Sequence, residues 1–539
     1  MNKLASMPLV LLFILPLCFM VFVVLASGFD AAGWAALMQH PQLVHGLGLS
    51  FATGIGATIV SIMMALLIAA SYFERGQLSK LGTSVGTMLA VPHLAFAIGF
   101  GFLIMPSGLI ARILAQIFSW LEPPHWATMH DAYGLALTAA LIAKETGFLL
   151  FVLVNVLSRE DIPQSFTAQR HSAISLGHSS LSSWLRLFIP QLLPHMLWPL
   201  IVVFIYSSTV VDMSLVLGPT QPPVFADVIW ADINSADPLA NARGTAGALF
   251  ISMIAAGLLI LARAIAVFIR PLVLRWITRG PSHIISFAWA GPAKWMALKT
   301  FYVFVIATLI VLSFAALWPF PKLVPETLNA DAWQNVAAHS EPLLISLVLA
   351  LSTSMAALII LILWLENVSQ KFDRWILVFC LMVLGLPALL IGLGQYQLFL
   401  WLHLTGTLLG LFLAHLLPVV AYMFIMLNGP YRCYDTKWNN AATALMAPTL
   451  KFLIQIKWSM LKAPLLSSVA VGFAVSFAQF VPAQLVAAGR YSTLPMEAVT
   501  LSSGSNRPLT AAFALLLMVP PLAIFLLSNF YGKQRWGNA

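Results

Sequence analysis

Long apolar runs dominate this sequence of 539 residues and limit the folds that it can adopt. A helix needs about 20 mainly apolar residues to cross a bilayer, whereas the strands of a membrane barrel are about 10 residues long and alternate in polarity. The runs have helical length, so the sequence predicts an all-α integral membrane protein. About twelve transmembrane helices are expected, near residues 8–27, 46–71, 85–105, 133–157, 192–217, 244–269, 300–318, 343–365, 375–395, 402–427, 465–487 and 508–529.

Composition excludes several other classes of protein. Hydrophobic residues make up 60% of the chain and charged residues 8%, with a mean hydropathy of +0.93. Soluble domains are about 25% charged, so a soluble fold, intrinsic disorder and nucleic-acid binding are not expected. The three cysteines, Cys18, Cys380 and Cys433, are too far apart for a CxxC site. The first run has some features of a signal peptide, but its length and the eleven runs after it favour an uncleaved anchor.

The distribution of basic residues predicts an orientation. If the N-terminus is cytoplasmic, 21 of the 27 Lys and Arg residues fall on cytoplasmic segments. Cytoplasmic loops carry the excess of Lys and Arg in membrane proteins, so both termini are expected inside. These basic residues also account for the net charge of +9, and we expect them to set the topology and to contact anionic membrane lipid. Residues 109–121 are amphipathic, and we expect a helix that lies along the membrane surface or caps the bundle.

The two halves of the sequence resemble each other in the order of their Pro, Gly and polar segments. We predict a first repeat at 1–270, a basic cytoplasmic linker at 271–299 and a second repeat at 300–539. Six spans in each repeat give both copies the same orientation, so they are parallel repeats.

Each repeat has a cytoplasmic loop after its fourth span, at 161–190 and 435–464. In the first loop, Asp161 can cap a helix that ends near Gly177, and a short second helix follows up to Pro190. In the second, Asp435 can cap a helix, and Pro448 forces a turn. Both loops are predicted to form a helix–turn–helix that fits into a cleft of another protein.

The residues of these loops resemble the EAA loop of ABC importer permeases. The first loop has the motif spacing at Ala173, Gly177, Leu187, Ile189 and Pro190, and the second matches at Ala441, Ala442 and Ile456. Several positions depart from the motif. His171 and Asn440 replace its acidic residue, Ser172 replaces an alanine, Met446 replaces the glycine and Ser459 replaces the final proline. The resemblance covers essentially the whole chain as two fused permease domains, a form similar to the thiamine and ferric-iron importer permeases.

The resemblance implies the function and the partners. It implies the permease of a bacterial inner-membrane importer, in which a separate ATPase, expected as a dimer, grips both loops and drives alternating access. It also implies a periplasmic binding protein that delivers a small solute, thiamine-like, iron or similar, for movement into the cytoplasm. Whether the divergent second loop still couples to an ATPase remains open.

The chain carries no recognisable catalytic chemistry. It lacks a GxxxxGK[ST] phosphate loop, so ATP is expected on the partner, and no cofactor, metal site or catalytic residue is predicted in this chain. It also lacks the HExxH, GxSxG and GxGxxG motifs, and it is not expected to be an enzyme.

Three ionisable residues fall within predicted spans: Lys144, Glu145 and Asp212. A charge at the centre of a helix costs about 2.5–3.5 kcal/mol on insertion scales, so each needs a polar partner or cavity. These residues either line the translocation path or fix the bundle by pairing between helices. The alternatives to an ABC permease are an ion-coupled secondary transporter, with Glu145 as coupling group, a degenerate permease and a membrane-embedded enzyme.

Overall fold

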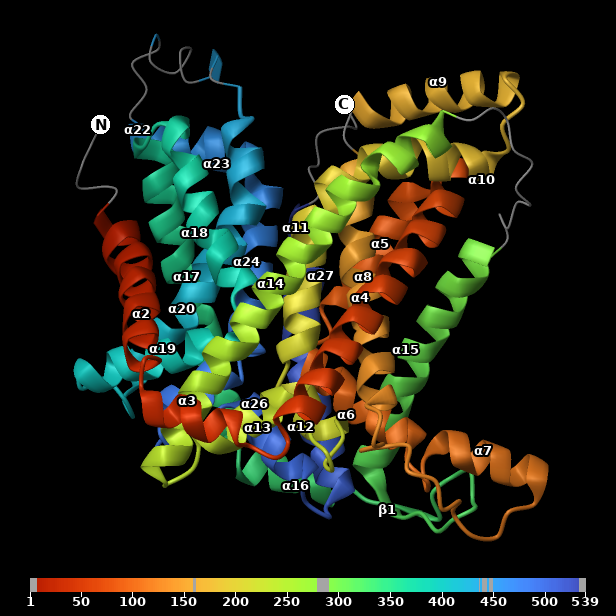
Figure 1. The fold of residues 1–539 in the computed structure, drawn as a ribbon, viewed down its shortest axis with the longest axis vertical. Helices are drawn as coiled ribbons and strands as arrows, with labels where there is room; N and C mark the ends of the chain where they lie inside the picture. Colours follow the sequence, from red (N-terminus) through yellow and green to blue (C-terminus); the bar gives the residue numbers. More distant parts are fainter. Residues whose placement is uncertain are drawn as a thin grey trace. The chain divides into compact units, whose positions relative to one another are not determined.

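The computed structural model describes residues 7–158, 161–278, 290–435, 437–438, 444 and 449–532. The protein is almost entirely helical, as predicted (Figure 1). Within the described residues, ten helical stretches are long and apolar enough to cross a membrane, or up to twelve if each of two bent pairs is one span. The expected all-α membrane architecture is confirmed.

The chain divides into two compact units. We call them the 30–328 unit, Asp30–Leu89 with Phe96–Leu328, and the 329–539 unit, Asn329–Ala539 with Met1–Phe29 and Ala90–Ala95. The 30–328 unit contains α3 (Ala31–Met38), α4 (Leu43–Glu74), α5 (Leu78–Leu89), most of α6 (His93–Ile104), α7 (Leu109–Phe118), α8 (Leu135–Leu157), α9 (Asp161–Ser175), α10 (Ser180–Ser183), η2 (Trp184–Phe188), α11 (Ile189–Thr209), α12 (Asp212–Leu217), α13 (Phe225–Ile233), α14 (Pro238–Ile277), α15 (Ala290–Phe314), β1 (Ala315–Leu317) and β2 (Thr327–Leu328). The 329–539 unit contains η1 (Val10–Ile14), α2 (Leu15–Ser27), α16 (Asp331–Ala338), α17 (Glu341–Asn367), η3 (Gln370–Phe372), α18 (Asp373–Gly385), α19 (Ala388–Trp401), α20 (Leu408–Arg432), α22 (Thr449–Phe452), η4 (Leu453–Lys457), α23 (Trp458–Met460), α24 (Lys462–Phe477), α25 (Val481–Ala487), α26 (Leu494–Ser502) and α27 (Arg507–Gly532).

The first helix of each sequence half belongs to the unit built mainly from the other half. Helix α2 packs on α19, where a Cβ atom on Gly394 would lie 3.0 Å from Met20 Cβ, so the missing side chain allows the close approach. Helix α15 packs on α4. The compact units therefore differ from the sequence repeats 1–270 and 300–539, whose duplication remains a prediction. The segment predicted as a linker, 271–299, is also partly helical, because α14 runs to Ile277 and α15 begins at Ala290.

Several predicted spans are broken, which corrects the continuous runs read from the sequence. The run 85–105 is divided between α5 and α6 around Pro92, and the run 375–395 bends by 105° between α18 and α19 at Pro387. Proline lacks an N–H and disfavours helix at the preceding residue, which explains both breaks. The runs 192–217 and 465–487 also divide, into α11 with α12 and α24 with α25, and the run 402–427 forms a helix only from Leu408.

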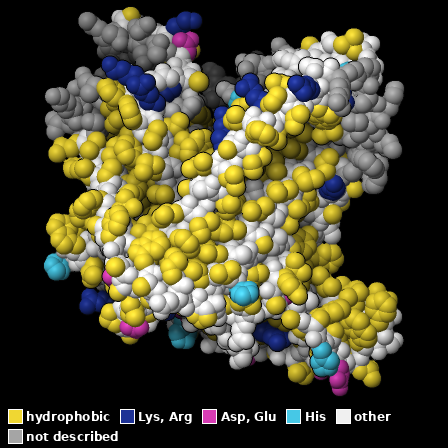
Figure 2. Space-filling model, in the orientation of Figure 1, with side chains coloured by type: hydrophobic (Ala, Val, Ile, Leu, Met, Phe, Trp, Pro, Cys, Tyr) yellow, Lys and Arg dark blue, Asp and Glu magenta, His cyan; other side chains and the backbone are white. Residues whose placement is uncertain are grey.

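Exposed apolar side chains cover the helices that would face lipid. Along α14 they include Ile260, Ile265, Phe268 and Leu272, and Figure 2 shows hydrophobic side chains along this helix. The predicted amphipathic segment forms α7, with Ile117 and Phe118 exposed. Its Arg112 is buried and donates to the carbonyls of Trp318, Pro319 and Lys322, so the polar face of α7 packs on the β1–β2 hairpin, in which Ala315 pairs with Leu328.

Candidate functional site

The first of the two predicted loops, 161–190, has the helix–turn–helix form expected for it. Helix α9 ends at Ser175, and Gly177 follows with φ of +86°, a conformation that glycine adopts without steric cost. The turn closes with hydrogen bonds from Gly177 N to the Ile174 carbonyl, 2.9 Å, and from His178 N to the Ala173 carbonyl, 3.0 Å. These bonds satisfy carbonyls at the helix end. Helix α10 and the π-helical turn η2 then lead into α11, near whose start Pro190 lies.

The predicted loop residues separate into a buried side and an exposed side. Ala173 is buried, whereas His171 and Ser172 are exposed on the same helix. Ile174 and Leu176, which flank the turn, are 45% and 71% exposed. The elbow thus presents small and apolar groups to its surroundings, a composition suited to a protein contact.

An aromatic cluster holds this loop to its unit. Phe166 of α9 stacks on Phe188 of η2 at 4.5 Å between ring centroids. Phe73, one residue before the last of α4, contacts Trp184 edge-on at 5.6 Å. Aromatic pairs of this kind add about 0.5–1.5 kcal/mol beyond their buried area. The elbow is therefore fixed to the end of α4 by rings from three elements.

The second loop is described only in part. Asn440, Ala441, Ala442, Met446 and Pro448 lie outside the described residues, so the predicted helix and turn stay a prediction. The following segment repeats a feature of the first loop, because η4, like η2, is a five-residue π-helical turn before the next long helix. Ile456 lies in η4 and is 39% exposed.

Two of the predicted in-span charges lie inside the 30–328 unit. Lys144 and Glu145 of α8 are 2% and 4% exposed. The Lys144 ammonium lies 3.5 Å from the Met88 carbonyl oxygen and 5.7 Å from the centre of the Tyr302 ring. These contacts with α5 and α15 favour the reading in which the charge fixes helix packing. A role in the translocation path stays a prediction.

Asp212 lies elsewhere and in a different setting from the one predicted. The sequence places it inside a continuous fifth span, but α11 ends at Thr209 and Asp212 starts the separate helix α12. Valine residues 210 and 211 are buried at this break, and Asp212 is half-buried. Ser214 and Leu215, just after it, line a cavity that Asp212 does not line.

That cavity has a volume of about 320 Å³ and is lined by His40, His130, Ser214, Asp227 and Asp232 among others. Ser214 Oγ donates to Asp227 Oδ2 at 2.6 Å, while Asp227 Oδ1 is buried and has no hydrogen-bond partner within the described chain. Burial raises the pKa of Asp227 to about 7. Asp227 was not predicted from the sequence, because its segment has no motif and was expected to be a polar outer loop, whereas the structure places it in the first turn of α13.

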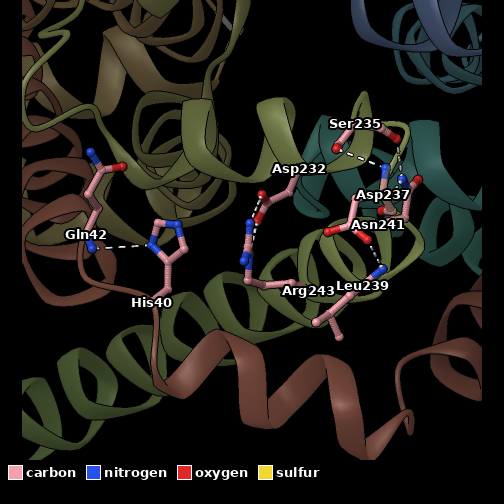
Figure 3. Close-up of polar contacts among 8 residues, drawn as sticks. All are labelled: His40, Gln42, Asp232, Ser235, Asp237, Leu239, Asn241 and Arg243. Carbon is pink, nitrogen blue, oxygen red and sulfur yellow. Dashed lines mark hydrogen bonds and ion pairs between the residues drawn. The ribbon is translucent and has the colours of Figure 1, made fainter.

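The second carboxylate of the cavity is neutralised by a neighbouring cation. Asp232 accepts two hydrogen bonds from Arg243, at 2.8 and 2.6 Å (Figure 3). Asp237 caps the same helix α14 through Leu239 N, and His40 Nδ1 accepts from Gln42 N at 3.3 Å. Burial, and secondly Arg243, lowers the pKa of His40. Asp227 is thus the acidic group of this cavity that has no ion-pair partner among the described residues.

The raised pKa of Asp227 predicts a pH-dependent stability. The folded chain keeps the proton of Asp227 up to about pH 7, whereas the unfolded chain loses it near the ordinary pKa of 3.8. The contribution of this proton to the free energy of unfolding is therefore complete below pH 3.8 and is lost as the pH rises from there through 7. At 1.36 kcal/mol per unit, the unfolding free energy should be about 1.4 kcal/mol lower at pH 8 than at pH 6. Thermal unfolding of the parent and Asp227→Asn measures this, and equal pH slopes in the two would contradict it.

A buried polar cluster in the 329–539 unit was also not predicted. His415 Nδ1 lies 2.9 Å from Ser476 Oγ, and Thr353 Oγ1 donates to the same oxygen at 3.0 Å. Gln395 Nε2 donates to the Ala414 carbonyl at 2.9 Å. That carbonyl has no helical N–H partner, because the residue four positions later is Pro418. The Gln395 amide thus replaces the N–H that Pro418 lacks within α20, and only the proline inside an apolar run signals this in the sequence.

Comparison with known proteins places this architecture. No family model matches the chain. The chain is 28% identical over 501 residues to the inner membrane ABC transporter permease protein YnjC of Escherichia coli (strain K12), and the match covers 93% of this chain and 90% of that protein. This likeness extends over nearly the whole of both chains and confirms the resemblance predicted from the sequence, so the protein is a relative of an inner-membrane ABC transporter permease.

Proposed function

We propose that this chain is the membrane permease of an ABC importer, which moves a small solute from the periplasm to the cytoplasm with both of its termini cytoplasmic. The observation that carries the proposal is the elbow of α9, Gly177 and α10. It is a preformed helix–turn–helix with exposed apolar residues at its tip, and its sequence has the motif spacing by which such permeases dock their ATPase. The likeness to YnjC supports the same role.

In the proposed mechanism the chain transmits movement and carries out no chemistry. A separate ATPase dimer grips the loops 161–190 and 435–464, and its closure on ATP displaces them. The first loop moves with α4 because Phe73, Phe166 and Phe188 pack together. Helix movement then opens a path alternately to each side of the membrane, since packed interfaces switch between discrete arrangements.

The solute class is proposed from the resemblance and from one feature of the cavity. Thiamine-like compounds and iron are cationic, and Asp227 offers a carboxyl group with one oxygen free of hydrogen bonds within the described residues. A periplasmic binding protein would deliver such a solute. Asp212, beside the same cavity-lining segment, is a further candidate for the path, together with Lys144 and Glu145.

Reconstitution in proteoliposomes tests the proposal. We expect an ATPase subunit to copurify with the full chain, and uptake of radiolabelled thiamine or ferric ion, supplied with the binding protein, to require ATP. Uptake without ATP that collapses with a protonophore would replace the proposal with an ion-coupled transporter. A retained ATPase without uptake of either solute or of the binding protein's own ligand would indicate a degenerate permease.

A further inference from the structure

The second loop is held to its unit by charge. Lys457, the last residue of η4, lies 2.8 and 2.9 Å from the two carboxylate oxygens of Glu366, near the end of α17. The side chains of Lys457 and Glu366 are only 8% and 19% exposed. Water therefore screens this pair less than it screens a surface ion pair.

Aromatic side chains complete the surroundings of this pair. The Tyr431 hydroxyl of α20 donates to Glu366 and accepts a hydrogen bond from Trp458 Nε1 at 3.0 Å. The Lys457 ammonium lies over the rings of Tyr431 and Tyr434, 4.7 and 5.3 Å from their centres. The carboxylate thus joins α17, α20 and the loop segment, and each partner restricts the geometry of the others.

The first loop has an aromatic contact at the corresponding position. Phe188 is the last residue of η2, as Lys457 is of η4, and it contacts Phe73 near the end of α4. The two π-helical turns therefore place different chemistry at the same position. An aromatic contact tolerates sliding, whereas a buried ion pair loses several kcal/mol when its partners separate.

We propose that Lys457 and Glu366 are positioning residues that make the second loop and the end of α17 move as one body when an ATPase displaces the loop. This inference rests on the proposed function and deepens it. The second loop departs most from the motif, and the ion pair of Lys457 with Glu366 gives it a specific means of coupling. This ion pair does not depend on the altered positions Met446 and Ser459. The first loop uses Phe188 and Phe73 for the same task.

Spin-label distances test this link without a known solute. Labels at Ile454 of η4 and Leu363 of α17, both exposed, are introduced after the native cysteines Cys18, Cys380 and Cys433 are replaced. In the full chain with its ATPase, we expect one narrow distance distribution that ATP does not change. Lys457→Met and Glu366→Gln should broaden it on addition of ATP, and ATP-driven uptake should fall about tenfold.

Matched variants separate a link from mere stabilisation. Lys371→Met removes an exposed Lys of η3, just beyond the end of α17 and outside the loop 435–464, and should leave both readouts unchanged, as should Lys457→Arg, which keeps the charge. The exchange Lys457→Glu with Glu366→Lys should restore the narrow distribution even if the single variants are poorly folded. An ATP-independent distance in the folded single variants, or uptake within twofold of the parent, overturns the link. Absence of any bound ATPase on the parent overturns the proposed function instead.

Discussion

Replacing Gly177 with valine is expected to reduce ATP-driven uptake by at least about tenfold while the protein still inserts in the membrane. The residue has φ of +86°, and an L-residue in the left-handed region costs about 1–2 kcal/mol, with a β-branched side chain at the upper end. A loss of about 1.4 kcal/mol lowers the equilibrium constant between the correct elbow and its alternatives tenfold. The ATPase retained by the purified chain and the rate of uptake measure the effect.

Gly177→Asn is the matched control for this substitution. Asparagine enters the left-handed region more readily than other residues, so this variant should keep most of the uptake. The elbow lies outside the long apolar helices, so Gly177→Asn should keep the thermal stability of the parent to within about 1 kcal/mol, and Gly177→Val should lose no more than the ~2 kcal/mol of the strained turn. Normal uptake by the valine variant would show that the shape of the elbow does not matter for docking.

The sequence predicts the membrane architecture well because run length is a direct consequence of bilayer thickness. It predicts the interruptions poorly. Pro92 and Pro387 are present in the sequence, but the mean hydropathy of a window of about 20 residues changes little when one of them is a proline. The sequence therefore predicts one span for α5 with α6 and one for α18 with α19. The exchange of α2 and α15 between units could not be predicted, because apolar helix surfaces of similar composition give no indication of their partners.

The candidate site also has a part that the sequence predicts and a part that it does not. The turn at Gly177 was predictable because glycine at a helix end has a local physical reason, and the structure confirms it. Asp227 and the pair of Lys457 and Glu366 were not, because the partners are brought together by tertiary packing. Lys457 and Glu366 are 91 residues apart, and each alone reads as an ordinary basic or acidic residue at a helix end.

The largest stability effect is expected at Arg432, which joins the ends of three helices. Its guanidinium donates to both carboxylate oxygens of Asp373, at 2.7 and 2.9 Å, and to the carbonyls of Leu365 and Val368, both at 2.9 Å. Trp364 Nε1 donates to the same carboxylate at 2.9 Å. Helices α17, α18 and α20 thus meet at one planar group whose donors match the carboxylate in two places.

Arg432→Met should therefore lower the unfolding free energy by about 3–5 kcal/mol, because it leaves the buried Asp373 carboxylate without its cation. Thermal unfolding in nanodiscs measures the loss as a melting temperature several degrees lower. Lys437→Met is the matched control, because the ion pair of Lys437 with Asp435 is exposed and 3.7 Å long, and its loss should cost less than about 1 kcal/mol. The double variant Arg432→Met with Asp373→Leu should recover part of the loss, since no buried charge then remains unpaired. If Arg432→Met and Lys437→Met melted at the same temperature, the junction of the three helices would not depend on this pair.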